Sequence, residues 1–347
     1  MTAGAYRQVI AASARDRLDI FLTAANRLGT PIGNVEKDFW VCWTLDTLYH
    51  RLSENGPRLL LKGGTSLSKA YGLIQRFSED IDITVFREDL DQSATVEDLE
   101  ALSNKQRRRK LNAIRDACRA YIVGPLKDGL ARALAEETGR PGRVDVDADD
   151  PDSQTLLVWY PEVEPRDGAY VRPAVRIECG AKSALDPHRH VAISPYIVAD
   201  APSLDLAVPD VTTIDADRTF WDKIVIVHGL RRWYERRGAL RQEGQRVSRH
   251  YYDLHCLMAS EVGRAALGNL ELSADCVRHA RMFFDRPDLD LASAEPGSFA
   301  IAPTADMVEA LRRDYGNTAA MIFGVAPTFD DILASIAELD AAANRAA

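Results

Sequence analysis

The sequence predicts an α/β (α+β) protein with two lobes: a mixed sheet that carries helices in residues 1–205, and a mostly helical lobe in residues 206–347. Three observations lead to this fold. Apolar runs of strand length alternate with segments of helical apolar spacing in the first part of the chain. Pro202 to Pro209 is typical of a linker, and from Ile214 onward the apolar residues keep helical spacing. A chain of 347 residues suits one large or two ordinary domains.

Composition narrows the class of protein. The net charge of −9 argues against a generally sticky nucleic-acid binder, although it leaves room for a local basic surface. The five cysteines are scattered and form no C-x-x-C pair, so neither a zinc site nor a disulfide framework is expected. No apolar run approaches the ~20 residues that cross a membrane, and the first residues lack the apolar core of a secretory signal. We expect a cytoplasmic protein with reduced thiols and no membrane partner.

Two helices are expected before the first strand. Residues Ala5 to Leu28 place apolar side chains near helical spacing, and Gly29 to Gly33 interrupts the pattern. Asn34 is the expected N-cap of a second helix that runs to about Leu52.

A glycine turn follows the first strand. Leu59 to Leu61 is an apolar run of strand length, and Ser66 to Ile74 has helical apolar spacing. Between them, Gly63 and Gly64 allow a sharp turn and a close approach to a ligand. A glycine turn that leads into a helix is typical of a phosphate site. Hydroxyl groups and positive charge are supplied nearby by Thr65, Ser66, Lys62 and Lys69.

The next strand carries two carboxylates. From Asp80 the sequence reads D-I-D-I-T-V, and alternate side chains of a strand share one face. Asp80 and Asp82 therefore project together, and they repel each other unless a cation lies between them. Mg²⁺ prefers oxygen ligands and commonly binds together with substrate phosphates. The pattern suggests a nucleoside triphosphate beside a metal site.

Helices and then strands are expected after the carboxylates. Val96 to Glu137 is predicted to be helical, and its basic run, Lys105 to Lys110, is either a solvated helix face or a contact for an RNA backbone. Asp145 to Ser153 lacks the glycine and glutamate of a calcium loop and is expected to be an exposed acidic turn. Three strands are then predicted: Thr155 to Val163, Tyr170 to Gly180, and His190 to Val198. On the second of these strands, Arg176 and Glu178 share the face opposite Val175, Ile177 and Cys179.

The C-terminal lobe is expected to be helical. Asp215 is the predicted N-cap of a helix that starts at Ala216. Arg231 to His250 is very basic, with Trp233 and Tyr234 interleaved, and Gly238 and Gly244 suggest a mobile loop. Such arginines either form a solvated helix end or contact RNA, and the RNA-binding candidates are Arg231, Arg232, Arg236 and Arg237. Further helices are expected to the end, with a frayed tail at Ala342 to Ala347.

Four motifs carry a resemblance to a known family. G-G-T-S-L from Gly63 and R-F-S-E-D-I-D from Arg76 resemble the DNA polymerase β-type nucleotidyltransferase superfamily, and more closely its AbiEii/AbiGii (MenT-like) toxin family. A lysine motif is matched at Lys223, where Asp222 replaces the usual glutamate. R-H-Y-Y-D-L resembles the last motif and is matched at Asp253. The resemblance implies a nucleotidyltransferase-type sheet with the nucleotide in a cleft between the lobes.

The resemblance also implies site residues. Asp80, Asp82 and Glu178 would bind Mg²⁺ or Mn²⁺, although Glu178 could instead form a surface pair with Arg176. Asp253 would orient Lys223 or Arg249, or contact the metal or the acceptor, and Lys37 is a weak phosphate candidate. From the residues alone, Lys223 would be a solvated lysine and Asp253 an ordinary helix-face aspartate. The nucleotide-binding candidates are Gly63, Gly64, Thr65, Ser66, Lys62, Ser78 and Lys223.

The function that the resemblance implies is that of a toxin in a type IV toxin–antitoxin system, with a role in phage defence. The enzyme would add nucleotides from an NTP to RNA, at the 3′ acceptor end of tRNA, release pyrophosphate and stop translation and growth. An antitoxin would be encoded nearby. Two alternatives stay open: a nucleotidyltransferase that modifies a protein or a small molecule, and a non-catalytic binding protein of the same fold. Phosphorylation of Ser78 would add negative charge beside the Asp pair, and we expect it to switch the enzyme off.

Overall fold

The computed structural model describes residues 3–163, 172–241 and 246–345, which form two compact units. Unit 1 comprises Met1–Ala70, Phe77–Ala94 and Gln106–Thr213, and unit 2 comprises Tyr71–Arg76, Thr95–Lys105 and Ile214–Ala347. The expected lobes of residues 1–205 and 206–347 stay a prediction, because compact packing alone does not show which segments behave as domains.

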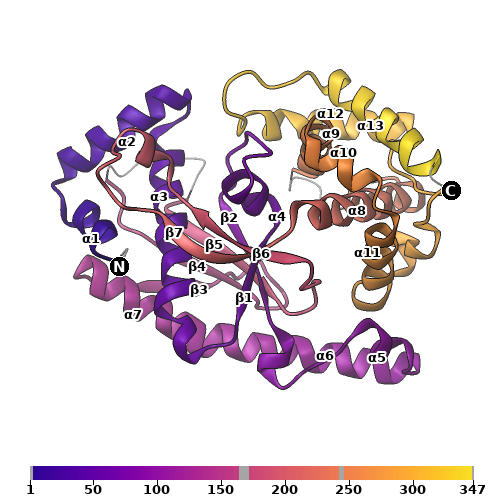
Figure 1. The fold of residues 1–347 in the computed structure, drawn as a ribbon, viewed down its shortest axis with the longest axis horizontal. Coiled ribbons are helices and arrows are strands. Elements are labelled where there is room, and N and C mark those ends of the chain that lie inside the picture. Colours follow the sequence, from indigo (N-terminus) through magenta and orange to yellow (C-terminus); the bar gives the residue numbers. More distant parts are fainter. Residues whose placement is uncertain (1–2, 164–171, 242–245, 346–347) are drawn as a thin grey trace. The chain divides into compact units, whose positions relative to one another are not determined.

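A seven-stranded mixed sheet forms the centre of unit 1 (Figure 1). The strand order is β3-β4-β5-β2-β1-β7-β6. β2 is antiparallel to β1 and parallel to β5, while β4 is antiparallel to both β3 and β5. This mixed α/β architecture confirms the predicted fold class. The strands are β1 (Leu59–Lys62), β2 (Asp80–Val85), β3 (Arg143–Val146), β4 (Thr155–Trp159), β5 (Ala174–Gly180), β6 (His188–Ile193) and β7 (Val208–Ile214).

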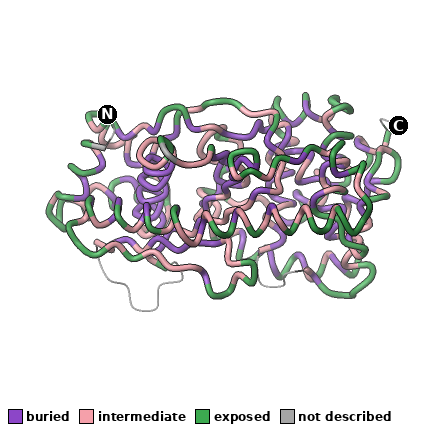
Figure 2. Tube along the Cα trace, turned by 90° about the horizontal axis from the view of Figure 1, so that it is seen from below, coloured by how far each residue is buried: buried purple, intermediate pink, exposed green. Residues whose placement is uncertain are grey.

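Helices pack on this sheet. α3 lies against β5, and α7 lies against β3 and β4. α3 is buried from Asn34 to Asp46 and carries Phe39, Trp40 and Trp43 into the core. Figure 2 colours the buried residues of both units purple. The helices of unit 1 are α1 (Ala3–Ala11), α2 (Ala14–Leu28), α3 (Ile32–Asp46), the short α4 (Gly63–Thr65), most of α6 (Asn104–Tyr121) and α7 (Lys127–Thr138).

Unit 2 is helical and is built around α8. Phe220, Trp221 and Ile224 of α8 are fully buried, and α8 packs against α9, α10 and α11. None of the described helices is long and apolar enough to cross a membrane. The helices of this unit are α5 (Val96–Glu100), α8 (Ala216–Arg237), α9 (Arg249–Ala259), α10 (Glu261–Leu267), α11 (Leu270–Phe283), α12 (Ala305–Ala319) and α13 (Phe329–Arg345).

Several predicted helix boundaries are wrong. The first helix is interrupted after Ala11, because Ser13 caps a new helix by accepting a hydrogen bond from the backbone N–H of Asp16. α3 begins at Ile32 after Pro31, whose fixed φ suits a helix start, so Asn34 is not the N-cap. The helix after the glycine turn ends at Ala70, because Gly72 takes a φ of +62°.

The middle of the chain differs from the prediction as well. Residues 96–138 form three helices instead of one, with Pro125 in the π-helical turn before α7. The expected linker already belongs to β7 from Val208, and α13 stays helical to Arg345, where a frayed tail was expected. Tyr170, at the expected start of β5, and Gly244, in the expected mobile loop, lie outside the described residues.

Candidate active site

The glycine turn lies directly against one of the predicted metal carboxylates. Gly63 follows β1 with a φ of +75°, a conformation that favours glycine. A Cβ atom added there would fall 2.1 Å from Oδ2 of Asp82, so a side chain at this position would displace the carboxylate. The antiparallel pairing of β1 with β2 places Lys62 opposite Asp82 and brings the turn to this point.

Two hydroxyl groups fix the turn from inside. Thr65 Oγ1 donates to Ser78 Oγ at 2.8 Å and contacts the backbone carbonyl of Asp80. Ser66 Oγ donates to the carbonyl of Gly63 at 2.8 Å, and both Thr65 and Ser66 are fully buried. These hydroxyls therefore form hydrogen bonds to protein atoms, whereas the sequence suggested that they would donate to phosphates. Their contacts tie the turn to the loop that leads into β2.

Carboxylates and cations alternate across β2 and β5. The strand register pairs Asp80 with Arg176 and Asp82 with Glu178. Arg176 forms an ion pair with Glu178, and its Nη1 lies 3.9 Å from Oδ2 of Asp80. Lys62 Nζ lies 3.6 Å from Oδ1 of Asp82. Both interpretations of Glu178, as a metal ligand and as the ion-pair partner of Arg176, therefore stay open: it lies beside the Asp pair, and it also pairs with Arg176.

Arg176 has a further partner that the sequence did not indicate. Its Nε donates to Oδ2 of Asp147 at 3.1 Å, and Asp147 is buried. The exposed acidic turn expected for Asp145 to Ser153 is therefore wrong at Asp147, because this carboxylate is buried against the half-buried guanidinium of Arg176. Asp145 itself lies in β3.

Crowding of carboxylates perturbs Asp80. Burial, together with the neighbouring Glu79 and Glu178, raises the pKa of Asp80 to about 6, against the opposing effects of Arg176 and Lys37. Such a group favours a cation beside it, because a cation relieves the repulsion among like charges.

The donors at this face fit a hard divalent cation. In the described part of the chain, no three potential ligands already lie close enough to hold a metal. Mg²⁺ needs fewer protein ligands, because it is usually bound by one or two carboxylates together with substrate phosphates. Asp80 and Asp82 supply two such carboxylates on one face, and the missing Cβ of Gly63 leaves room beside Asp82. In this structure Arg176 and Lys62 provide the balancing positive charge.

Two ion pairs connect α3 to the segments that carry the site. Lys37 Nζ lies 3.0 Å from Oε2 of Glu79, so this lysine balances a carboxylate next to Asp80. Lys69 Nζ lies 2.6 Å from Oδ1 of Asp38 and 3.7 Å from the centre of the Tyr196 ring. The sequence suggested a phosphate contact for Lys37. It gave no sign of the partners of either lysine, since each lies far along the chain.

A second charged cluster is built within unit 2. Arg76 donates to both carboxylate oxygens of Asp253, through Nε at 2.8 Å and Nη2 at 2.9 Å. Lys223 Nζ lies 2.8 Å from Oδ2 of the same Asp253. Asp253 is 0% exposed and Lys223 5% exposed, so the alternatives of a solvated lysine and a surface aspartate are wrong. Asp253 is in position to orient Lys223, one of the roles that the resemblance implied.

The cluster perturbs its own pKa values. Burial would raise the pKa of Asp253, but Arg76 and Lys223 hold it well below the ordinary value. Burial also lowers the pKa of Lys223; Asp253 opposes this shift, while Arg76 and Arg249 add to it. Arg76 therefore acts on both partners, because its positive charge stabilises the carboxylate and opposes a second cation.

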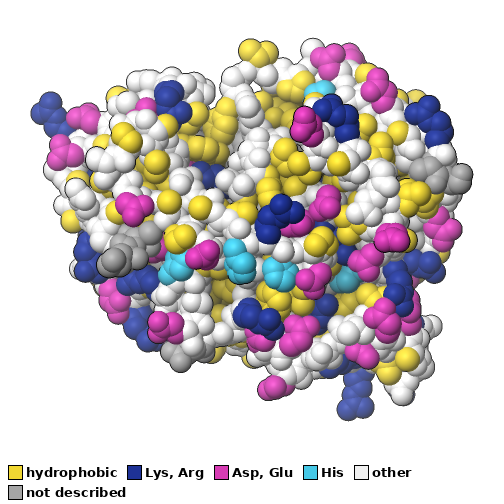
Figure 3. Space-filling view, in the orientation of Figure 1, with side chains coloured by type: hydrophobic (Ala, Val, Ile, Leu, Met, Phe, Trp, Pro, Cys, Tyr) yellow, Lys and Arg dark blue, Asp and Glu magenta, His cyan; other side chains and the backbone are white. Residues whose placement is uncertain are grey.

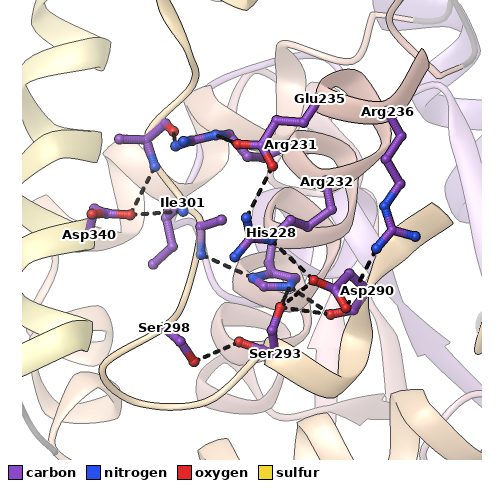
Figure 4. Close-up of polar contacts among 12 residues, drawn as sticks. His228, Arg231, Arg232, Glu235, Arg236, Asp290, Ser293, Ser298, Ile301 and Asp340 are labelled. Carbon is purple, nitrogen blue, oxygen red and sulfur yellow. Dashed lines mark hydrogen bonds and ion pairs between the residues drawn. The ribbon is translucent and has the colours of Figure 1, made fainter. Parts of the chain in front are cut away.

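The arginines at the end of α8 are paired with acidic groups. Arg231 and Arg232 contact Glu235, Arg232 and Arg236 contact Asp290, and these contacts surround the buried His228 (Figure 4). Arg237 pairs with Asp288. On the face drawn in Figure 3, basic and acidic side chains are likewise intermixed. The carboxylates offset much of the charge that an RNA backbone would meet at these arginines.

His228 beside them is a structural histidine. Its Nδ1 accepts a hydrogen bond from the Ala300 N–H at 3.0 Å, so its Nε2 carries the proton and donates to the carbonyl of Asp290 at 3.1 Å. Burial lowers the pKa of His228 and favours this neutral form. Ser293 lies near Nε2, but Nδ1 has a backbone donor as its partner, which excludes a serine–histidine–aspartate relay here.

Comparisons with known proteins agree with the motifs. A family model described as "Nucleotidyl transferase AbiEii toxin, Type IV TA system" matches residues 46–335. Among solved structures, the chain is similar to MenT4, a nucleotidyltransferase toxin from Mycobacterium tuberculosis H37Rv, with 16% sequence identity, a TM-score of 0.43, and coverage of 94% of this chain and 98% of that chain. No curated protein matches the sequence. The family match spans most of the chain and contains all four motifs, so the chain belongs to the AbiEii family of nucleotidyltransferase toxins of type IV toxin–antitoxin systems.

Proposed function

We propose that this nucleotidyltransferase toxin adds nucleotides from an NTP to the 3′ acceptor end of tRNA in a Mg²⁺-dependent reaction. Membership of the family supplies the reaction class, an NTP donor, a divalent cation and a cognate antitoxin. The observation that carries the proposal is the placement of Asp80 and Asp82 on one face of β2, with the Gly63 backbone directly against Asp82. Extension of the acceptor end would block aminoacylation and so stop growth.

Asp80 and Asp82, with Glu178 from the neighbouring β5, would hold Mg²⁺ or Mn²⁺. When bound, such a cation offsets the charge of the triphosphate and stabilises the displacement of pyrophosphate. Lys62 and Arg176 now balance these carboxylates. Once a cation took over that task, both side chains could turn to other anions.

The glycine turn and Lys223 would hold the triphosphate. Gly63 and Gly64 let the backbone come close to the phosphates, and the hydroxyls of Thr65 and Ser66 keep the turn in shape from within. The ammonium group of Lys223 would offset phosphate charge, while Asp253 fixes its position.

Glu178 is the better candidate for the base that accepts the proton of the attacking hydroxyl. Asp253 is fully buried, and Arg76 and Lys223 hold its pKa well below the ordinary value, so it resists protonation. The side chain of Glu178 is 37% exposed, and it lies on the strand next to Asp82. A general base must reach the acceptor hydroxyl as well as accept its proton, and the partly exposed Glu178 is more accessible to an acceptor than the buried Asp253.

The choice of RNA as acceptor rests on the basic run of α6. Lys105, Arg108 and Arg109 are exposed there, whereas the arginines at the end of α8 are offset by carboxylates. Exposed cations in a row suit a phosphate backbone. A protein or small-molecule acceptor is the second candidate, because the metal face alone does not select an acceptor. We also propose that the toxin acts in the cytoplasm and that its antitoxin is encoded nearby.

The deciding experiment incubates the purified protein with total tRNA, Mg²⁺ and each labelled NTP separately. An Asp82→Ala variant and a reaction with EDTA serve as controls. Label on tRNA from one NTP, absent in both controls, is the expected result. Calorimetric binding of an NTP without label on any RNA would refute the tRNA acceptor and favour a protein or small molecule. Absence of both binding and transfer would favour a non-catalytic protein.

A further inference from the structure

Arg176 brings three carboxylates together on one guanidinium. Its Nη1 donates to Oε1 of Glu178 and lies 3.9 Å from Oδ2 of Asp80, and both of these residues are proposed metal ligands. Its Nε donates to Oδ2 of Asp147 at 3.1 Å. The same side chain therefore contacts two proposed metal ligands through one nitrogen and a carboxylate outside the metal site through another.

The carboxylate of Asp147 is held in place by its own backbone surroundings. Its Oδ1 accepts a hydrogen bond from the N–H of Asp149 at 3.1 Å, and its N–H donates to the carbonyl of Thr155 at 2.9 Å. Asp147 is 6% exposed, whereas the side chain of Arg176 is 34% exposed. Asp147 is thus a fixed partner for Nε, while the arginine itself stays accessible to a ligand.

We infer that Arg176 is a triphosphate-binding residue that competes with the metal for Glu178 and Asp80 in the free protein, and that Asp147 is its positioning residue. The inference rests on the proposed function, in which these carboxylates hold the metal beside a triphosphate. A guanidinium stays charged, so a divalent cation that arrives alone has to displace it and is repelled by it. Phosphate oxygens that arrive with the metal give the released Nη donors a new partner.

The geometry suits this exchange because an arginine carries five N–H donors. The contact with Asp147 uses the single donor on Nε and leaves the four Nη protons for partners that change. A planar guanidinium matches phosphate as well as carboxylate, so Nη1 can pass from one to the other while Nε stays on Asp147. A lysine at position 176 would keep the charge but would concentrate it at one point.

The test compares the metal alone with the metal and nucleotide together. Calorimetry measures the affinity of the purified protein for Mn²⁺ and, separately, for a non-hydrolysable analogue of each NTP in the presence of Mg²⁺. Both are measured at about pH 8, above the pKa of about 6 of Asp80, so that protons do not compete with the metal. Arg176→Met should bind Mn²⁺ alone about tenfold or more tightly and the NTP analogue about tenfold or more weakly, the range expected for a charge-assisted contact.

Two more variants keep the inference testable if Arg176→Met does not fold. Asp147→Asn removes the charge that offsets Arg176, so Mn²⁺ alone should bind more weakly than it does to the wild type. Arg176→Lys keeps a cation beside the carboxylates, so Mn²⁺ binding should stay near the wild-type value and only part of the NTP affinity should be restored. A merely structural role of Arg176 would weaken both affinities together, and that result would refute the inference.

Arg143→Met is the matched control. Arg143 is an arginine of the same sheet, on β3, and its Nη2 lies 2.8 Å from Oδ2 of Asp145, which is not one of the proposed metal ligands. This variant should leave both affinities unchanged. If Arg176→Met changes neither affinity while Asp82→Ala abolishes Mn²⁺ binding, the role of Arg176 is refuted and the proposed function stands. If Asp82→Ala binds Mn²⁺ as the wild type does, the proposed metal site itself fails, and this inference fails with it.

Discussion

Gly63→Ala is the substitution that tests most directly whether the glycine turn must lie against Asp82. An added Cβ would fall 2.1 Å from Oδ2 and 2.7 Å from Cγ of Asp82. The favourable contact distance between non-bonded heavy atoms is about 3.5 Å, so the carboxylate or the turn has to move by about 1 Å. A displacement of this size at a reacting centre costs about 100-fold in rate. We expect nucleotidyl transfer to fall by about that factor.

The same substitution also has a backbone cost. Gly63 has a φ of +75°, where an L-residue costs about 1–2 kcal/mol. Gly139→Ala provides the matched control in the same unit. Gly139 has a φ of +65° at the end of α7, and no described atom lies within 4 Å of an added Cβ. It should carry the backbone cost alone and keep full activity.

Two measurements separate these effects. Urea unfolding reports the loss of stability, which is the backbone cost alone in Gly139→Ala and includes the contact with Asp82 as well in Gly63→Ala, and label transfer to tRNA reports the displacement of Asp82. The reasoning is refuted if Gly63→Ala retains wild-type transfer. It is refuted equally if Gly139→Ala loses as much transfer as Gly63→Ala, since the loss would then follow from backbone strain.

Four further predictions concern charge. Asp253→Ala should lower the free energy of unfolding by about 3–5 kcal/mol, because it leaves two buried cations without their carboxylate, and an unchanged urea midpoint would contradict this. The pKa of Asp253 is held below its unfolded value of about 3.9, so the stability that this carboxylate contributes is full above about pH 4 and is lost as the pH falls. The difference in unfolding free energy between the wild type and Asp253→Asn should therefore narrow below about pH 4. A difference that stays constant with pH would argue against the pairing. Burial lowers the pKa of His228, so stability should fall as pH drops through about 6.5, and His228→Gln should remove that dependence in the unfolding free energy; equal pH dependence in both proteins would refute it. A carboxylate added by Ser78→Glu next to the Asp80 loop should abolish transfer, whereas the uncharged Ser78→Gln of the same size should lose less, and undiminished activity of Ser78→Glu would defeat the idea of a phosphorylation switch.

The central β-α-β segment could be predicted from the sequence because its signals are local. Alternation in D-I-D-I-T-V predicts that Asp80 and Asp82 share a face of a strand, and the structure confirms the strand, which it pairs antiparallel with β1. The same period places Glu178 opposite Val175, Ile177 and Cys179, which is confirmed by the burial of Val175 and Ile177 in β5 while Glu178 is partly exposed. Period and glycine content are properties of a few neighbouring residues, so a single sequence reveals them.

The partners of the charged residues could not be predicted because they depend on long-range folding. Arg76 and Asp253 are 177 residues apart in the chain, and Lys37 and Glu79 are 42 apart. No local pattern links such pairs. The burial of Lys223 has the same cause: its helix position indicates an edge of the apolar stripe, but the carboxylate that allows burial comes from another helix. The predicted helix ends were wrong because they depend on single residues: Gly72 ends a helix through its positive φ, and Ser13 starts one as its N-cap.

Two buried ion networks in this chain differ in a way that separates architecture from function. Asp38 is held by Lys69 and by the backbone N–H of Tyr196, and the cation also lies over the Tyr196 ring, so the network has one carboxylate for one ammonium. Such a balanced pair can be replaced by apolar residues at little cost, and its presence alone does not indicate a ligand. The Asp253 network instead joins two buried cations, Arg76 and Lys223, to one carboxylate, and the buried Nδ1 of His250 beside it has no hydrogen-bond partner in the described part of the chain. Asp253 thereby fixes the position of Lys223, which is the role that the proposed nucleotidyl transfer requires of this carboxylate.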